Sequence, residues 1–455
     1  MIALACAGAA LAAASPQVLG VQEKLPNDLV WLFSEQSGLP VVTIQLMAKA
    51  GALQEPPGKE GLANLTATLL LSGTKKRTAA QIAQELDFLG AKLAASGGED
   101  SAQVSLTVLK KDLAAGLDLF QDVLLQPAFA PQEVARIVAQ TQASLKSDED
   151  EPGVVASRRF RKDLFGPFPY GHPVRGTQKG LAAITPKDLV EFHRRGYRPN
   201  NAILTVAGDL TQEEARKWVA RIFGSWPSGP VTANKLPPVP PLNEPRVVVI
   251  DKDITQANII LGHLGITRAN PDFYALQVMN YLLGGGGFAS RLVDNIRVNR
   301  GLVYAVSSQF DPGLEPGAFA VVLETKNPSA KEAVEQVLVE IKRMRAEPVT
   351  ATELEDAKSY LIGSFPRKMD SLSRRASLMA YVQFYGLGLD YPWRYPDLIR
   401  NVTAADIQKV AEKYLHPDKY LLVVVGKKSE MPSPYGTASR PGEEEKKDGQ
   451  KKPQH

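Results

Sequence analysis

The sequence of 455 residues contains very little cysteine and histidine, and this scarcity excludes several kinds of site. Its single cysteine, Cys6, can form neither a disulfide within the chain nor a thiolate zinc cluster. No two histidines lie three or four residues apart, as they would on a metal-binding helix. The five are His172, His193, His263, His416 and His455. Any mechanism that needs a local pair of histidines is therefore excluded.

The chain also lacks a large excess of positive or negative charge. The chain has 53 Lys and Arg against 49 Asp and Glu, a formal net charge of +4. Such a small excess over a large surface gives no reason to expect nucleic acid or an acidic membrane as a partner. At 44% hydrophobic and 22% charged residues, the composition is that of an ordinary globular protein. After the N-terminal segment, no stretch has the apolar length of a membrane helix.

The N-terminal segment is apolar from Ile2 to Ala14 and ends in small residues. This pattern resembles the apolar region and cleavage site of a signal peptide, although a positively charged start is missing. The alternative is a short N-terminus without such a role. We expect residues 1–24 to be the remnant of a signal peptide and a lead-in, and the protein to be exported, for example to a periplasm.

Proline and polar residues divide the rest of the chain. Residues 227–245 read PSGPVTANKLPPVPPLNEP, which is too rich in proline for a helix or a central strand. This linker separates two predicted domains, 25–226 and 246–428. The last segment, 429–455, is rich in Pro, Gly, Lys and Glu and cannot bury a core. We expect this tail to be disordered.

The two halves resemble each other. Residues 184–208 align with residues 402–426 without a gap, and Thr185 then matches Thr403. Each copy reads as an N-capped amphipathic helix, a turn that contains proline, and an apolar strand. The agreement in capping residue, turn and strand indicates that the chain arose by duplication.

The order of predicted elements indicates the fold class. Strands are expected within 41–50 and 247–264, and a hairpin within 91–108. In each half an apolar helix and a loop that contains glycine follow the first strands. Helices and strands alternate too irregularly for repeated βαβ units. We therefore predict an α+β fold of two homologous halves, each a mainly antiparallel sheet with helices packed on it.

One helical segment carries small polar residues where a site could lie. Residues 60–74 read EGLANLTATLLLSGT, and Asn64 and Thr68 are four residues apart with Ala67 between them. At this spacing the three positions share a helix face. The sequence pattern alone does not explain why an apolar helix would carry small polar residues on this face.

Four phrases carry a resemblance to a known family: PGKEGLANL, FGPFPYGHPVRGT, YRPNNAILTVAGDL and GGGGFASRLVDNIRVNRGLVYAVSSQF. Together with the duplicated halves, they make residues 25–428 similar to one protomer of the pitrilysin/insulinase-type zinc peptidases. The resemblance is to the half-length form typified by the subunits of mitochondrial processing peptidase.

The resemblance implies a zinc site that this chain has lost. Catalytic members carry H-x-x-E-H on the corresponding helix, where two His bind zinc and the Glu activates water. Here Asn64, Ala67 and Thr68 occupy these positions, and Ser144 is aligned with the third ligand, a Glu. These side chains suit neither zinc nor a general base. The acidic run 148–151 could rescue a metal site, but it reads better as a solvated loop.

The second half keeps a pair that the resemblance makes functional. Arg297 and Tyr304 match an Arg and a Tyr that in the family act on the zinc-bearing half. The resemblance implies that Arg297 holds a substrate carbonyl and that Tyr304 donates a hydrogen bond to the oxyanion. The alternative is a surface cation and a tyrosine packed on a sheet. Arg300 competes for the arginine role, although its spacing to Tyr304 differs from that in the family.

A glycine run precedes this pair and consists of Gly284, Gly285, Gly286 and Gly287. It lacks the Gly-Lys-Ser/Thr that would follow in a P-loop. The resemblance implies a loop that borders the substrate, and the alternative is a plain turn.

Taken together, these patterns predict a subunit without zinc in a heteromeric zinc metallopeptidase. Its homologous partner would carry H-x-x-E-H and the zinc, and this chain would contribute substrate binding and oxyanion stabilisation. Alone, the chain should be inactive; peptides or unfolded proteins would be the substrates. One alternative is an inert structural or assembly scaffold of the same fold, and another is a solitary peptide-binding protein.

Overall fold

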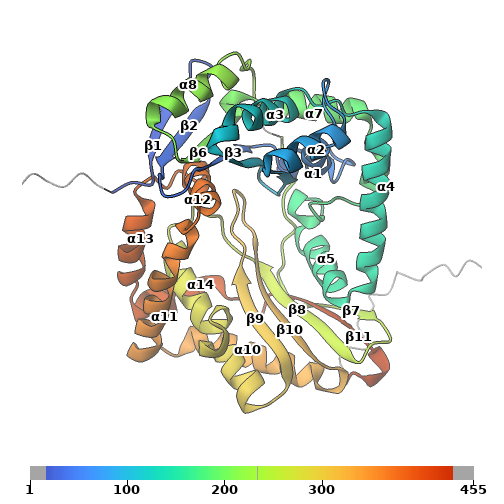
Figure 1. Ribbon diagram of the computed structural model, residues 1–455. Helices are drawn as coiled ribbons and strands as arrows, with labels where there is room; N and C mark the ends of the chain where they lie inside the picture. The colour runs from blue at the N-terminus through green and yellow to red at the C-terminus, as the bar shows by residue number, and fades with distance from the viewer. Residues whose placement is uncertain (1–16, 233, 434–455) are drawn as a thin grey trace, which may run out of the picture. The chain divides into compact units, whose positions relative to one another are not determined.

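The computed structural model describes residues 17–232 and 234–433, which contain two β-sheets (Figure 1). The apolar N-terminal run and residues 434–455 of the tail lie outside the described residues, so the signal peptide, export and a disordered tail stay predictions. Among the described residues, no helix has the length and apolar character needed to cross a membrane.

The first sheet has six strands in the order β1-β2-β6-β3-β5-β4. Their bounds are β1 Val21–Lys24, β2 Val30–Glu35, β3 Val41–Ala48, β4 Lys92–Gly97, β5 Ala102–Leu109 and β6 Ala202–Gly208. Strands β2 and β6 are parallel and every other pair is antiparallel. Strands β4 and β5 form the hairpin predicted within 91–108, and β4 is an edge of the sheet.

The second sheet has five strands in the order β7-β11-β8-β10-β9. Their bounds are β7 Arg246–Asp251, β8 Gln256–Leu264, β9 Val303–Phe310, β10 Ala318–Lys326 and β11 Leu421–Gly426. Strands β7 and β11 are parallel and the other pairs are antiparallel. The region 247–264 therefore holds two strands, and β9 is an edge.

The strand orders confirm the predicted similarity of the halves. Five strands of the first sheet, in the order β2-β6-β3-β5-β4, correspond one to one with the strands of the second sheet, β7-β11-β8-β10-β9. The corresponding strands also run in the same relative directions. The repeated helices are α7 (Pro186–Gly196) and α14 (Ala404–Tyr414), which begin with matching capping boxes at Thr185 and Thr403. The α+β fold class, with mainly antiparallel sheets and packed helices, is confirmed.

The remaining α-helices connect and cover these strands. In the first half they are α1 Leu62–Leu69, α2 Ala79–Leu89, α3 Leu113–Leu125, α4 Pro131–Ser147, α5 Pro152–Phe165, α6 Gln178–Ala183 and α8 Gln212–Phe223. In the second half they are α9 Phe273–Asn280, α10 Ala330–Ala346, α11 Ala351–Ser364, α12 Leu372–Phe384 and α13 Tyr391–Arg400.

The chain forms two compact units that are not continuous in sequence. Among the described residues, unit 1 joins residues 17–142 with Pro173–Leu236 and Lys358–Val402. Unit 2 joins Ala143–His172 and Pro237–Ala357 with the chain from Thr403 onward. The predicted boundary at the linker separates the two duplicated halves of the sequence. Each compact unit, in contrast, contains segments from both halves.

Two helices carry this exchange. Helix α5, from the first half of the chain, packs on β11 and β8 in unit 2 (Figure 1). Helix α12, from the second half, packs on β6 and β3 in unit 1. Each sheet is therefore covered on one face by a helix from the other half of the sequence.

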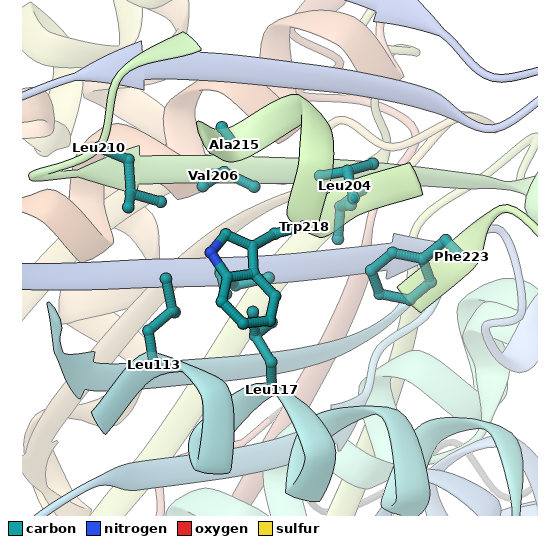
Figure 2. A pocket seen from close by; sticks show the side chains of 10 residues that line it. Leu113, Leu117, Leu204, Val206, Leu210, Ala215, Trp218 and Phe223 are labelled. Atoms are coloured by element: carbon teal, nitrogen blue, oxygen red, sulfur yellow. The ribbon is translucent and has the colours of Figure 1, made fainter. Parts of the chain in front are cut away.

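The opposite face of the first sheet forms an apolar core with α3 and α8. Figure 2 shows Trp218 of α8 in the middle of a group that includes Leu113 and Leu117 of α3, Phe223 of α8 and the strand residue Leu204. The cavity among these side chains holds about 10 Å³, which is space for a single water at most. This cavity is a packing defect of the core and not a ligand site.

Candidate functional site

Helix α1 exposes two of the residues that the sequence singled out. Asn64 and Thr68 are partly exposed, whereas every other residue from Leu62 to Leu69 is buried. Ala67 has no exposed surface. The helix thus leaves accessible the two positions at which the family resemblance implies histidines in catalytic members.

The N-terminus of α1 is held by a buried carboxyl group that sequence reasoning missed. The backbone N–H groups of Gly61 and Ala63 donate to the Glu55 carboxyl at 2.8–3.1 Å. Burial raises the pKa of Glu55 to about 8, and these two backbone hydrogen bonds act in the opposite direction. Glu55 takes the place of a side-chain cap, because the capping residue Gly61 has none. Nothing in the local sequence pattern marked this contact.

A close approach of two glycines fixes the same helix start. Gly61 and Gly176 both have positive φ angles, of 99° and 92°. A Cβ atom on Gly61 would lie 2.8 Å from the Cα of Gly176, so neither position has room for a side chain. Nearby, Lys59 forms an ion pair of 2.8 Å with Asp188. The two glycines belong to two of the phrases that carried the family resemblance, and their contact explains why both are needed.

The side chains on the exposed strip do not fit a zinc ion. The Asn64 Oδ1 accepts a long hydrogen bond of 3.4 Å from the backbone N–H of Gly97, at the end of the edge strand β4. Thr68 offers a neutral hydroxyl, and Ala67 offers no proton acceptor. Over the described ranges, no three His, Cys, Asp or Glu side chains gather as a metal site would need.

The predicted third position lies on a different helix. Ser144 is in the last turns of α4 and belongs to unit 2, whereas α1 belongs to unit 1. The acidic run that follows is a short 3₁₀ helix over Asp148–Asp150. Asp148 forms an ion pair of 2.9 Å with Arg158, and Glu149 and Asp150 are exposed. This arrangement agrees with a solvated acidic loop.

Unit 2 presents Arg297 and Tyr304 on adjacent elements. Arg297 is exposed on the π-helix Val293–Asn299, and Tyr304, on the edge strand β9, is 49% exposed. The guanidinium of Arg297 lies 5.0 Å from the centre of the Phe288 ring. Arg300 instead donates from Nε to the Asn295 side chain at 2.9 Å. Both arginines are exposed, but Arg300 is hydrogen-bonded to Asn295, whereas Arg297 lies over the Phe288 ring.

The glycine run forms a tight turn ahead of this pair. Gly284 is buried, and a Cβ atom there would lie 2.6 Å from the backbone nitrogen of Ser308 in β9. Gly287 has a φ of +57°. The run begins in the π-helix Tyr281–Gly285 and continues into a 3₁₀ turn over Gly287–Ala289, and it lacks the Lys and Ser/Thr that would complete a phosphate-binding loop. The run shapes a turn against β9.

Two family models match the chain. Residues 32–178 match the model of insulinase (peptidase family M16), and residues 183–361 match the model of the peptidase M16 inactive domain. Both sequence phrases around α1 lie within the first match, and Arg297 and Tyr304 lie within the second.

Relatives and solved structures extend the match to most of the chain. An uncharacterized zinc protease of Rickettsia bellii is 29% identical over 86% of this chain and 93% of its own length. The non-peptidase homolog YmxG of Helicobacter pylori is 25% identical over 87% and 91%. The structure of a peptidase M16 inactive domain from Pseudomonas fluorescens superposes with a TM-score of 0.85, at 29% identity, over 91% of this chain and 99% of that one. The chain belongs to peptidase family M16.

Proposed function

We propose that this chain is the subunit without zinc of a heteromeric M16 peptidase. A homologous partner would carry H-x-x-E-H and the zinc, and this chain would contribute Arg297 and Tyr304 to peptide binding and oxyanion stabilisation. The observation that carries the proposal is a contrast within the molecule. Helix α1 is held in place but lacks ligands and base, whereas Arg297 and Tyr304 are kept and exposed.

The chemistry of the two residues supports the role. A guanidinium with open donors can bind a peptide carbonyl, and a phenol hydroxyl can donate to the oxygen on which charge develops. Among the described residues, Arg297 has no ion pair that would compete for its donors. The edge strand β9 that carries Tyr304 also offers backbone groups to which an extended peptide could pair.

A scaffold without enzymatic function is the second candidate. It is favoured by the name of the Helicobacter pylori relative, which is called a non-peptidase homolog. A scaffold has no use for an oxyanion donor, so the two candidates differ in what they predict for Tyr304.

The test is reconstitution with a partner that carries H-x-x-E-H. The purified chain alone should bind no stoichiometric zinc and should cleave no peptide. With the partner, chelator-sensitive cleavage should appear, and Tyr304→Phe should lower kcat about 10²- to 10³-fold while the complex still assembles. Sizing chromatography and steady-state peptide cleavage measure both properties.

Two outcomes would count against the proposal. One tightly bound zinc per isolated chain would contradict the lost site. Complexes of Tyr304→Phe and Arg297→Ala that both assemble and cleave at the wild-type rate would leave the scaffold as the better explanation. The triple variant Asn64→His, Ala67→Glu, Thr68→His should remain inactive alone, because the third carboxylate is still missing.

A further inference from the structure

An exposed phenylalanine follows the glycine run on a well-anchored turn. Phe288 is 72% exposed. Before it, Gly284 packs directly against β9; after it, the buried Ser290 donates from Oγ to the carbonyl oxygen of Gly287 at 2.6 Å. Because the backbone is anchored on both sides of the turn, it determines the exposed position of the Phe288 ring.

The Phe288 ring meets one particular arginine. Three arginines lie close together in the sequence, and each has a different environment. Arg291 forms an ion pair of 2.8 Å with Glu353, and Arg300 donates to Asn295. Arg297 lies over Phe288, at 5.0 Å from the guanidinium carbon to the ring centre. Within the described residues no ion pair occupies its donors, which can therefore serve another group.

The backbone beneath Arg297 is also fixed. Asn295 donates from Nδ2 to Glu340 at 2.6 Å, and Glu340 has no exposed surface. With the π-helix held in this way, the direction of the Arg297 side chain depends on its own rotatable bonds. An arginine on a protein surface samples many rotamers, and a ring in contact with the guanidinium restricts them.

We propose that Phe288 is a positioning residue for Arg297. Its ring holds the guanidinium flat, so that the open N–H donors are oriented before a peptide carbonyl arrives. The inference rests on the proposed role of Arg297 and deepens it. A cation–π contact at an exposed site corresponds to about a two- to fivefold change in affinity. The effect should appear in KM more than in kcat, since the carbonyl is bound in the ground state too.

The experiment is a double-mutant cycle in the reconstituted complex. Phe288→Ala and Phe288→Leu should each raise KM about two- to fivefold, because both remove the aromatic face. Phe288→Trp should keep the wild-type KM, since indole also binds guanidinium. In the Arg297→Ala background, Phe288→Ala should have no further effect. Phe88→Ala, which removes an 89% exposed phenylalanine on α2, is the matched control and should leave KM unchanged.

A second measurement does not depend on activity. In the isolated chain, the ring current of Phe288 should shift the Nε–H resonance of Arg297, and Phe288→Leu should abolish that shift. An unchanged resonance would overturn the proposal, and so would equal effects of Phe288→Ala with and without Arg297. A Phe288→Ala chain that no longer assembles would make the residue part of an interface instead. A wild-type complex without cleavage would refute the proposed function, whereas the ring-current shift would still report on the positioning contact.

Discussion

The two exchanged helices occupy the same place on similar sheets, but they are attached in different ways. Helix α5 lies on the second sheet with a stripe of buried apolar side chains, Ala156, Phe160 and Leu164. Helix α12 also buries apolar residues, but it adds polar contacts to the first sheet. Arg375 donates to the Ser34 hydroxyl at 2.7 Å, and Ser377 donates to the Gln45 side chain at 2.8 Å.

The difference follows from the strands beneath. The face of the first sheet toward α12 carries buried polar residues, Ser34, Thr43, Gln45 and Thr205. The corresponding positions of the second sheet are mostly apolar; the cross-strand partners Ile260 and Val423 are examples. Duplication has thus kept the topology while the chemistry of each contact has changed. In the proposed function the two units differ in the same way, with the catalytic positions of α1 replaced in unit 1 and Arg297 and Tyr304 available in unit 2.

The largest effect should come from separating the halves. A chain divided between Leu236 and Pro237 gives two pieces, each of which lacks the helix that covers its sheet. A few buried apolar side chains, at about 1.5–3 kcal/mol each, amount to much of the net stability of a domain. Neither piece alone should show cooperative urea unfolding by circular dichroism, and coexpression should restore it. A cooperative transition in either isolated piece would show that the exchange is dispensable.

A smaller effect should distinguish the two helix contacts. Phe160→Ala opens a cavity under α5 and should lower the free energy of unfolding by about 3–5 kcal/mol. Ser377→Ala removes one hydrogen bond under α12 and should cost about 1 kcal/mol. Urea titrations measure both, with Val154→Ala on the exposed side of α5 as control. Equal losses for Phe160→Ala and Ser377→Ala would remove the distinction between the helices.

An effect smaller than that of Phe160→Ala concerns one histidine in each unit. Burial lowers the pKa of His193 in unit 1 and of His263 in unit 2 from 6.5 to about 4. Between pH 6.5 and pH 4 the unfolded chain therefore binds more protons than the folded one, so stability is lost as the pH falls through this window. At pH 5 the loss for His263 should be about 2 kcal/mol relative to neutral pH.

The contacts of the two rings differ, although both pKa values fall to about 4. His263 Nδ1 lies 2.9 Å from the carbonyl oxygen of Leu264, and its Nε2 accepts from the backbone N–H of His416 at 3.2 Å. Protonation destroys that acceptor. The Nε2 of His193 lies 2.8 Å from the carbonyl oxygen of Leu124, and a donor there survives protonation. Since both pKa values fall to about 4, His263→Gln and His193→Gln should flatten the dependence of unfolding on pH to a similar extent, and a dependence that neither substitution changes would contradict this assignment.

Much of the site could be predicted from the sequence because its signals are local. The spacing of Asn64, Ala67 and Thr68 predicted a shared face of α1; the structure adds that Asn64 and Thr68 are partly exposed there and that Ala67 is buried. The matching caps at Thr185 and Thr403 predicted the repeated helices. The contact of Glu55 with α1 and that of Phe288 with Arg297 could not be predicted in this way. No helical or strand periodicity and no motif connects the residues in either contact.

By itself, the sequence determined the helices and strands, the duplication and the absence of zinc ligands on α1. These properties depend on side-chain type and on spacing along one element, which are readable without contacts. Only the tertiary structure decided which helix covers which sheet and which of two neighbouring exposed arginines lies over Phe288. Helix α5 could have packed on the sheet of its own half, because its apolar stripe does not specify which of the two sheets it contacts. The choice arises from contacts between residues about a hundred or more positions apart, such as Phe160 and Gly262, and these exist only once the sheets have formed.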